Sequence, residues 1–252
     1  ASDYERLAAP APRDADLSVA QVEDMVRQAV TLAGGLHQHL SPDAEWVVIK
    51  PNIVELKRQG SGVITDWRVV RALVRIVHEV AQQARISIAE GAAWVPPEKA
   101  DQVDLGMGMG GEQVVGDGFE IAGYRALLQD PGLAGIGLDL VDLNFDESHA
   151  VQVPGGGYVF ATYQIPQTIL ECDFLITVPV LKIIGAVGMT NALKNFVGIA
   201  PGTAYGWPKM RGTPGIPGLP HMPEILDEVI VDLTSLAEAD FAVVDAIVGM
   251  ER

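Results

Sequence analysis

Apolar residues recur at two spacings along the chain, and these spacings predict alternating helices and strands. From Ser18 to Gly35, Val and Ala recur at three- and four-residue steps, which predicts a capped helix. A second such stretch runs from Trp67 to about Gln83. Continuous apolar runs at Trp46–Ile49 and Ile86–Ala89 flank it, and such runs are typical of strands covered on both faces. This order predicts a βαβ unit with parallel strands and a right-handed crossover.

The remaining chain repeats the alternation less regularly. Further helices are predicted at residues 120–129, 167–171, 190–197 and 223–237, and further strands at 138–143, 174–180 and 241–244. Residues 150–153 and 158–163 predict a β-hairpin, while 95–118 and 198–220 are interpreted as Gly-rich loops. The pattern therefore predicts an α/β fold: a mostly parallel, doubly wound sheet with helices on both faces, plus a β-hairpin insertion.

The length of 252 residues and the hydrophobic content of 48% suffice for a sizeable core. Residues 1–17 are rich in Ala, Pro and Asp and are interpreted as an N-terminal arm or linker, followed by one α/β domain over 18–252. The chain begins at Ala1 without an initiator Met, which fits an exported mature protein or an incomplete chain. Localisation therefore stays open between cytoplasmic and exported. The apolar run Phe241–Val248 lies directly before the end, so we expect the domain to continue beyond Arg252.

Composition excludes several classes of function. The formal net charge is -16, with 17 basic and 33 acidic residues, so the basic footprint of a nucleic-acid or anionic-membrane binder is missing. No apolar run reaches the roughly 18 residues of a membrane span. The single cysteine, Cys172, cannot supply an iron–sulfur cluster or a structural zinc site, so neither is ligated by this segment alone.

Polar residues follow the predicted strands at their carboxyl ends, where ligands bind in open α/β sheets. These residues are Lys50 and Asn52 after the first strand, Glu90 after the second, and Lys182 and Asp245 after two later strands. An ordinary strand end can also carry a polar residue. As a set, they indicate one site at this edge of the sheet.

Two lysines make the site more specific. Lys182 stands in an apolar stretch, and Lys194 lies near the start of the predicted helix at 190–197, where a cation opposes the helix dipole. A bound carboxylate or phosphate would remove that conflict. Alternatively, these lysines pair with a buried carboxylate such as Glu90 or Asp245. The neighbouring Thr190, Asn191 and Asn195 would contribute further hydrogen bonds.

One histidine and two carboxylates are candidates for acid–base or metal chemistry. His221 ends the long loop, where it could act as an acid, a base or a metal ligand, although a lone loop histidine is often none of these. Glu90, His221 and Asp245 together could hold a hard metal ion, although no sequence spacing supports that set.

Several segments together resemble a known family in order and spacing. Its first half is matched by Val48-Ile49-Lys50-Pro51-Asn52, Thr65-Asp66 and Ile88-Ala89-Glu90-Gly91. Its second half is matched by Thr177–Lys182, Thr190–Gly198, His221 and Val244–Met250. Over residues 18–252 the chain thus resembles domain of unknown function family 362.

The resemblance implies an α/β fold and a prokaryotic protein of a group often linked with iron–sulfur or redox functions. Some relatives carry ferredoxin-like cysteine motifs or export signals. This chain has one cysteine, so cluster binding does not carry over to it. The family pattern also continues past the position that matches Met250.

The first hypothesis for function is an enzyme that acts on a small anionic substrate. Lys182, Lys194 and His221 would be catalytic, with Lys50, Asn52, Thr190, Asn191 and Asn195 binding the substrate. A second hypothesis is an accessory or assembly subunit of a redox or other multiprotein complex, which contacts a protein partner. The third is metal binding through Glu90 and Asp245. The sequence leaves reaction type and oligomeric state open.

Overall fold

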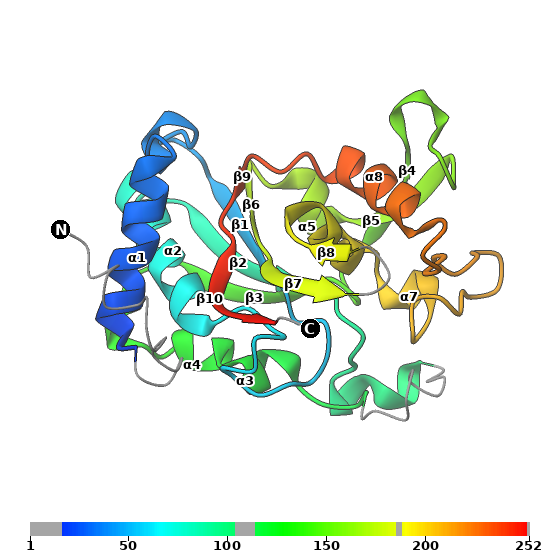
Figure 1. The fold of residues 1–252 in the computed structure, drawn as a ribbon, viewed down its shortest axis with the longest axis horizontal. Helices are drawn as coiled ribbons and strands as arrows, with labels where there is room; N and C mark the ends of the chain where they lie inside the picture. The colour runs from blue at the N-terminus through cyan, green and yellow to red at the C-terminus, as the bar shows by residue number, and fades with distance from the viewer. Residues whose placement is uncertain (1–16, 104–113, 185–187, 251–252) are drawn as a thin grey trace.

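The computed structural model describes residues 17–103, 114–184 and 188–250 (Figure 1). In this part of the chain, a five-stranded sheet lies at the centre, with the strand order β3-β2-β1-β6-β9. Its strands are β1 (Trp46–Pro51), β2 (Arg85–Glu90), β3 (Leu138–Asp142), β6 (Phe174–Val178) and β9 (Phe241–Ala242), and every neighbouring pair is parallel. The chain passes outward from β1 to β3 and then continues on the other side of β1, which confirms the predicted doubly wound sheet.

Two long helices cover one face of this sheet: α1 (Val19–Leu32) and α2 (Trp67–Val80). Ser18 and Gln21 form a capping box at the start of α1, and the side chain of Asp66 accepts a hydrogen bond from the Arg68 N–H at the start of α2. Alternate strand residues, such as Val47 and Ile49, point into this layer because side chains of a strand alternate between faces.

Shorter helices cover the opposite face. They are α5 (Gln167–Glu171), α6 (Ala192–Asn195) with the 3-10 turn η7 (Phe196–Ile199), and α8 (Leu226–Ala237). Val48 of β1 and Leu175 of β6 belong to this second core with Phe196 and Leu233. Helices therefore lie on both faces, as the sequence predicts.

The predicted strand over 174–180 is divided in the structure. Pro179 separates β6 from β7 (Val180–Ile184), which leaves the central sheet and joins a second, three-stranded sheet. In that sheet β7 lies between β8 (Gly188–Thr190), with which it is antiparallel, and β10 (Asp245–Met250), with which it is parallel. Proline has no N–H for a sheet hydrogen bond, so a break at this point has a simple local cause.

The other differences from prediction also have local causes. The hairpin is confirmed as β4 (Ser148–Gln152) and β5 (Thr162–Pro166), with the second strand a few residues later than expected. The helix expected at 120–129 is divided into α3 (Gly118–Ala122) and α4 (Tyr124–Leu127), because Gly123 between them has a φ of 87°. The loop at 198–220 contains one short helix, α7 (Gly202–Tyr205).

The remaining elements are short 3-10 turns: η3 (Leu36–Gln38), η4 (Pro97–Gln102), η5 (Pro131–Leu133) and η6 (Pro154–Gly156). Most of the proposed arm at 1–17 and part of the loop at 95–118 lie outside the described residues. Among the helices that are described, none has the length and apolar character needed to cross a membrane.

Candidate functional site

A cavity of about 460 Å³ lies at the carboxyl edge of the central sheet, where the strand order reverses between β1 and β6. Residues that follow β1, β2 and β6 line it, including Asn52, Gly91 and Pro179. Much of the wall is apolar, with Val54, Val63, Val180, Val197 and Leu219 among its residues. Its polar lining includes Glu90, Lys182, Lys194, Lys209 and His221. The location agrees with the general rule for ligand sites in open α/β sheets.

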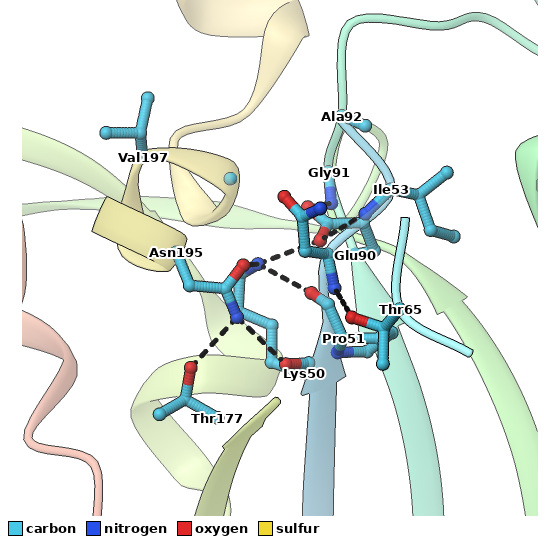
Figure 2. Close-up of polar contacts among 12 residues, drawn as sticks. Lys50, Pro51, Ile53, Thr65, Glu90, Gly91, Ala92, Thr177, Asn195 and Val197 are labelled. Carbon is cyan, nitrogen blue, oxygen red and sulfur yellow. Dashed lines mark hydrogen bonds and ion pairs between the residues drawn. The ribbon is translucent and has the colours of Figure 1, made fainter. Parts of the chain in front are cut away.

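Lys50 is fully buried and forms an ion pair with Glu90 (Figure 2). Its Nζ donates to Glu90 Oε2 over 2.9 Å, to the Pro51 carbonyl over 3.1 Å and to Asn195 Oδ1 over 3.2 Å. Burial lowers the pKa of Lys50, and the Glu90 carboxylate opposes that effect. All three ammonium N–H groups thus have acceptors, so Lys50 supports the site from within the protein.

Backbone and side-chain donors complete this buried network. Glu90 also accepts hydrogen bonds from the N–H groups of Ile53 and Gly91, and Asn195 Nδ2 donates to the Lys50 carbonyl and to Thr177 Oγ1. A Cβ atom at Gly198 would lie 2.7 Å from Lys50 Nζ, so a larger residue there would have to displace the ion pair. The network joins β1, β2, β6 and α6 at one point, which fixes the floor of the cavity.

Lys182 lines the cavity from β7 and is 7% exposed. Its Nζ donates to the Val63 carbonyl over 2.7 Å, and no ion pair to it is found in the described part of the chain. Burial lowers the pKa of Lys182 to about 8, and the positive charge of Lys194 contributes to that shift. The ammonium group of Lys182 is therefore held without a direct counter-ion.

Lys194 also lines the cavity, but the reason the sequence suggested for its importance is wrong. The helix expected at 190–197 is only the four-residue α6 followed by the 3-10 turn η7, so Lys194 lies in the last turn of α6 as much as in the first. No conflict with a helix dipole exists there. The described residues instead give its Nζ neither a hydrogen bond nor an ion pair, and burial lowers its pKa.

Lys209 is a cavity residue that sequence reasoning missed. It lies in the Gly- and Pro-rich loop, and its Nζ donates to three backbone carbonyls, those of Gly91, Val197 and Gly198. Burial lowers its pKa to about 7 and the positive charge of Lys50 adds to that shift, whereas the carboxylates of Glu90 and Asp142 oppose it. The available signal was that lysine is rare in this chain, with six in total.

His221 reaches the cavity from the end of the same loop. Burial, followed by the charge of Lys194, lowers its pKa to about 4. The imidazole is therefore neutral at pH 7.

Comparison with known proteins identifies the family. Residues 47–252 match the family described as Domain of unknown function (DUF362). The chain belongs to this family.

A curated relative of this DUF362 chain is the thylakoid-associated protein sll1697 of Synechocystis sp., with 22% identity over 223 residues. The match covers 86% of this chain and 56% of the relative, so the chain spans little more than half the length of that protein. Among solved structures, the lactate racemase apoprotein from Thermoanaerobacterium thermosaccharolyticum is similar with a TM-score of 0.49 and 13% identity. That match covers 88% of this chain and 48% of the racemase chain.

Four other residues expected to bind substrate line the cavity of the DUF362 chain: Asn52, Thr190, Asn191 and Asn195. Each also makes a hydrogen bond within the protein. Asn52 Nδ2 donates to the Val63 carbonyl, Thr190 Oγ1 donates to the Val180 carbonyl, and Asn191 Oδ1 accepts from the Ala192 N–H. These bonds orient the side chains along the wall.

Asp245 does not line the cavity in the described structure. Its carboxylate accepts hydrogen bonds from the N–H groups of Asp66 and Ile247, which ties β10 to the start of α2. Within the described ranges, no three His, Cys, Asp or Glu side chains are grouped so that they could hold a metal ion. The set of Glu90, His221 and Asp245 is therefore not gathered into a metal centre here.

Proposed function

We propose that this chain is an enzyme that binds a small organic anion, a carboxylate or a phosphate, in the cavity at the edge of the sheet. The observation that carries the proposal is a pair of cavity lysines, the buried Lys182 and the half-buried Lys194, for which the described structure holds no ion-pair partner. The chain has a formal net charge of -16, so carboxylates are plentiful, and yet none in the described structure forms an ion pair with either lysine.

The energetic argument concerns the cost of burial. Removing an ammonium group from water is unfavourable unless an opposite charge or several acceptors replace the water. Lys50 has such partners, whereas Lys194, which is half-buried, has none in the described part of the chain. Local destabilisation without a local gain is expected where a protein binds a ligand. A bound anion would supply the missing partner.

The cavity residues have distinct roles in this proposal. Lys182 and Lys194 hold the anion, and His221, neutral at pH 7, accepts or returns a proton. Lys50, Glu90 and Asn195 hold the floor in place. The apolar wall receives the carbon part of the ligand.

Thermal shift and titration calorimetry with a panel of carboxylates and phosphates test the proposal. Lys182→Met and Lys194→Met remove one charge each, and Arg85→Gln removes one charge at the amino end of β2, at the opposite edge of the sheet. We expect each lysine variant to weaken binding by about tenfold or more, which is the loss of one charged hydrogen bond. Arg85→Gln should bind as the parent protein does. Unchanged binding in both lysine variants would refute the proposal.

A further inference from the structure

The cavity lysines differ in what surrounds each Nζ atom. Lys209 donates to three carbonyl oxygens, so all its N–H groups are used. Lys182 donates only to the Val63 carbonyl, and Lys194 has no partner among the described residues. Among these cavity lysines, only Lys182 has an Nζ atom that is held in place by a hydrogen bond and can still form further bonds. Its Nζ is held by one hydrogen bond on a strand that is paired on both sides.

We propose that Lys182 is a nucleophile that forms an imine with the carbonyl carbon of an α-oxo acid, while Lys194 binds the carboxylate of the same molecule. The inference rests on the proposed function, because the carboxylate must first enter the cavity. It goes further by assigning different chemistry to two lysines and by naming the substrate class.

Only a neutral amine can attack a carbonyl group, and the surroundings of Lys182 favour that form. Burial and the nearby Lys194 charge lower its pKa to about 8, while Glu55 and Glu90 act in the opposite direction. At pH 7.5, such an amine is neutral about two orders of magnitude more often than an ordinary lysine. A second cation beside a buried lysine is a known way to activate it as a nucleophile.

Lys194 suits the role of carboxylate partner. It lies close enough to Lys182 to lower the pKa of that residue, and its own ammonium has no partner in the described structure. In an α-oxo acid the carboxylate is bonded directly to the carbonyl carbon. One such molecule can therefore contact both lysines, with its third substituent on the apolar wall formed by residues such as Val180 and Leu219.

The step balances without an oxidant or a reductant. The nitrogen lone pair of Lys182 forms a C–N bond to the carbonyl carbon, and the C=O π electrons move to oxygen. The two protons of the amine then pass to that oxygen one after the other, each carried by the His221 imidazole in the cavity wall. The first transfer gives a hydroxyl group, and with the second the C–O bond breaks and water leaves as the C=N bond forms. The products are one imine and one water molecule.

Borohydride trapping tests this assignment, because reduction makes an imine permanent. The protein is incubated with phenylpyruvate or pyruvate in the presence of borohydride, digested, and mapped by mass spectrometry. Phenylpropionate and propionate serve as matched acids that lack the carbonyl group. We expect one adduct, on Lys182, with the oxo acids and none with the matched acids. Phenylpyruvate should react at a lower concentration, because its ring can pack on the apolar wall.

Three variants separate the two roles. Lys182→Arg keeps a positive charge that can bind an anion but cannot form an imine, so it should bind phenylpropionate and give no adduct. Lys194→Met keeps the nucleophile but lacks the carboxylate partner, so its trapping should fall by about tenfold or more. Lys57→Arg changes a lysine whose side chain is 42% exposed and should match the parent protein.

The outcomes distinguish this inference from the proposed function. Binding of phenylpropionate without any trapped adduct would overturn the role of Lys182 and leave anion binding intact. An adduct on Lys194 or Lys209 would overturn the assignment as well. Failure to bind any acid of the panel would refute both proposals. Circular dichroism of each variant excludes a loss of fold as the cause of lost trapping.

Discussion

The floor and the wall of the cavity both contain lysines with little or limited exposure to solvent, but the surroundings of these lysines are opposite. In the floor, Lys50 is joined to Glu90, Asn195 and a backbone carbonyl, and every N–H group has an acceptor. In the wall, Lys182 has one carbonyl acceptor and Lys194 has no partner in the described part of the chain. Lys50 and Lys182 are both buried, so between these two the difference is in the partners.

This contrast distinguishes a lysine that supports the fold from lysines that can bind a ligand. A paired lysine already has its counter-charge, and it holds strands together. An unpaired lysine keeps its charge available for a molecule that comes from outside. Removing the first should therefore destabilise the fold, whereas removing the second should affect binding and spare or improve stability.

The largest effect is expected for Lys50→Met. This change leaves the Glu90 carboxylate buried without its cation, which costs about 3–5 kcal/mol of unfolding free energy. Urea denaturation followed by circular dichroism measures it. The double variant Lys50→Met/Glu90→Gln removes both charges and should recover part of the loss. If Lys50→Met alone unfolds at the parent's urea midpoint, the ion pair does not support the floor.

Lys194→Met should act in the opposite direction. It removes a half-buried ammonium that lacks a partner in the described structure, so we expect a gain of up to about 1 kcal/mol in the ligand-free protein. Thermal denaturation measures the change, with Lys57→Met as a control for an exposed lysine. A loss of stability similar to that of Lys50→Met would show that Lys194 is structural, and the contrast between wall and floor would disappear.

The smallest effect concerns pH. The folded-state pKa of Lys182 is about 8, below its ordinary value of 10.5, so between these values the unfolded chain binds more protons than the folded one. Stability from this residue therefore rises as pH increases from 7 to 9, by about 1 kcal/mol. Below pH 7 both states are protonated and the contribution is constant. Urea denaturation at pH 7 and 9 should show a smaller rise in Lys182→Met, and an equal rise would argue against a lowered pKa.

Much of the fold was predictable because its signals are local. The unit β1–α2–β2 follows from two apolar runs and a capped amphipathic helix, and all three elements lie close to the expected residues. The break at Pro179 and the second sheet were missed, because β7 finds its partners in β8 and β10, and the second of these lies more than 60 residues away. Such pairings leave no mark on the local pattern of apolar residues.

The site was predictable in part for the same reason. Strand ends gave Lys50, Glu90 and Lys182 because the edge of a parallel sheet follows from the strands themselves. A lysine forms an ion pair only if the fold brings a carboxylate close to it, and the sequence does not show such distances. The pairing of Lys50 and the lack of a described partner for Lys194 could therefore not be predicted from the sequence. Lys209 was missed because its loop has no periodic pattern, and Asp245 was included although it binds backbone N–H groups outside the cavity.

The position of β10 beside β7 has a consequence for the order of folding. β7 carries Lys182, and one of its two neighbours consists of residues 245–250, far along the chain. Contacts between distant segments form late, because a long loop must close before they give any stability. On the ribosome, β1 and β2 of the βαβ unit can pair before β10 has been added beside β7. The pocket should therefore reach its working shape only in the last stage of folding, after the body of the sheet is already in place.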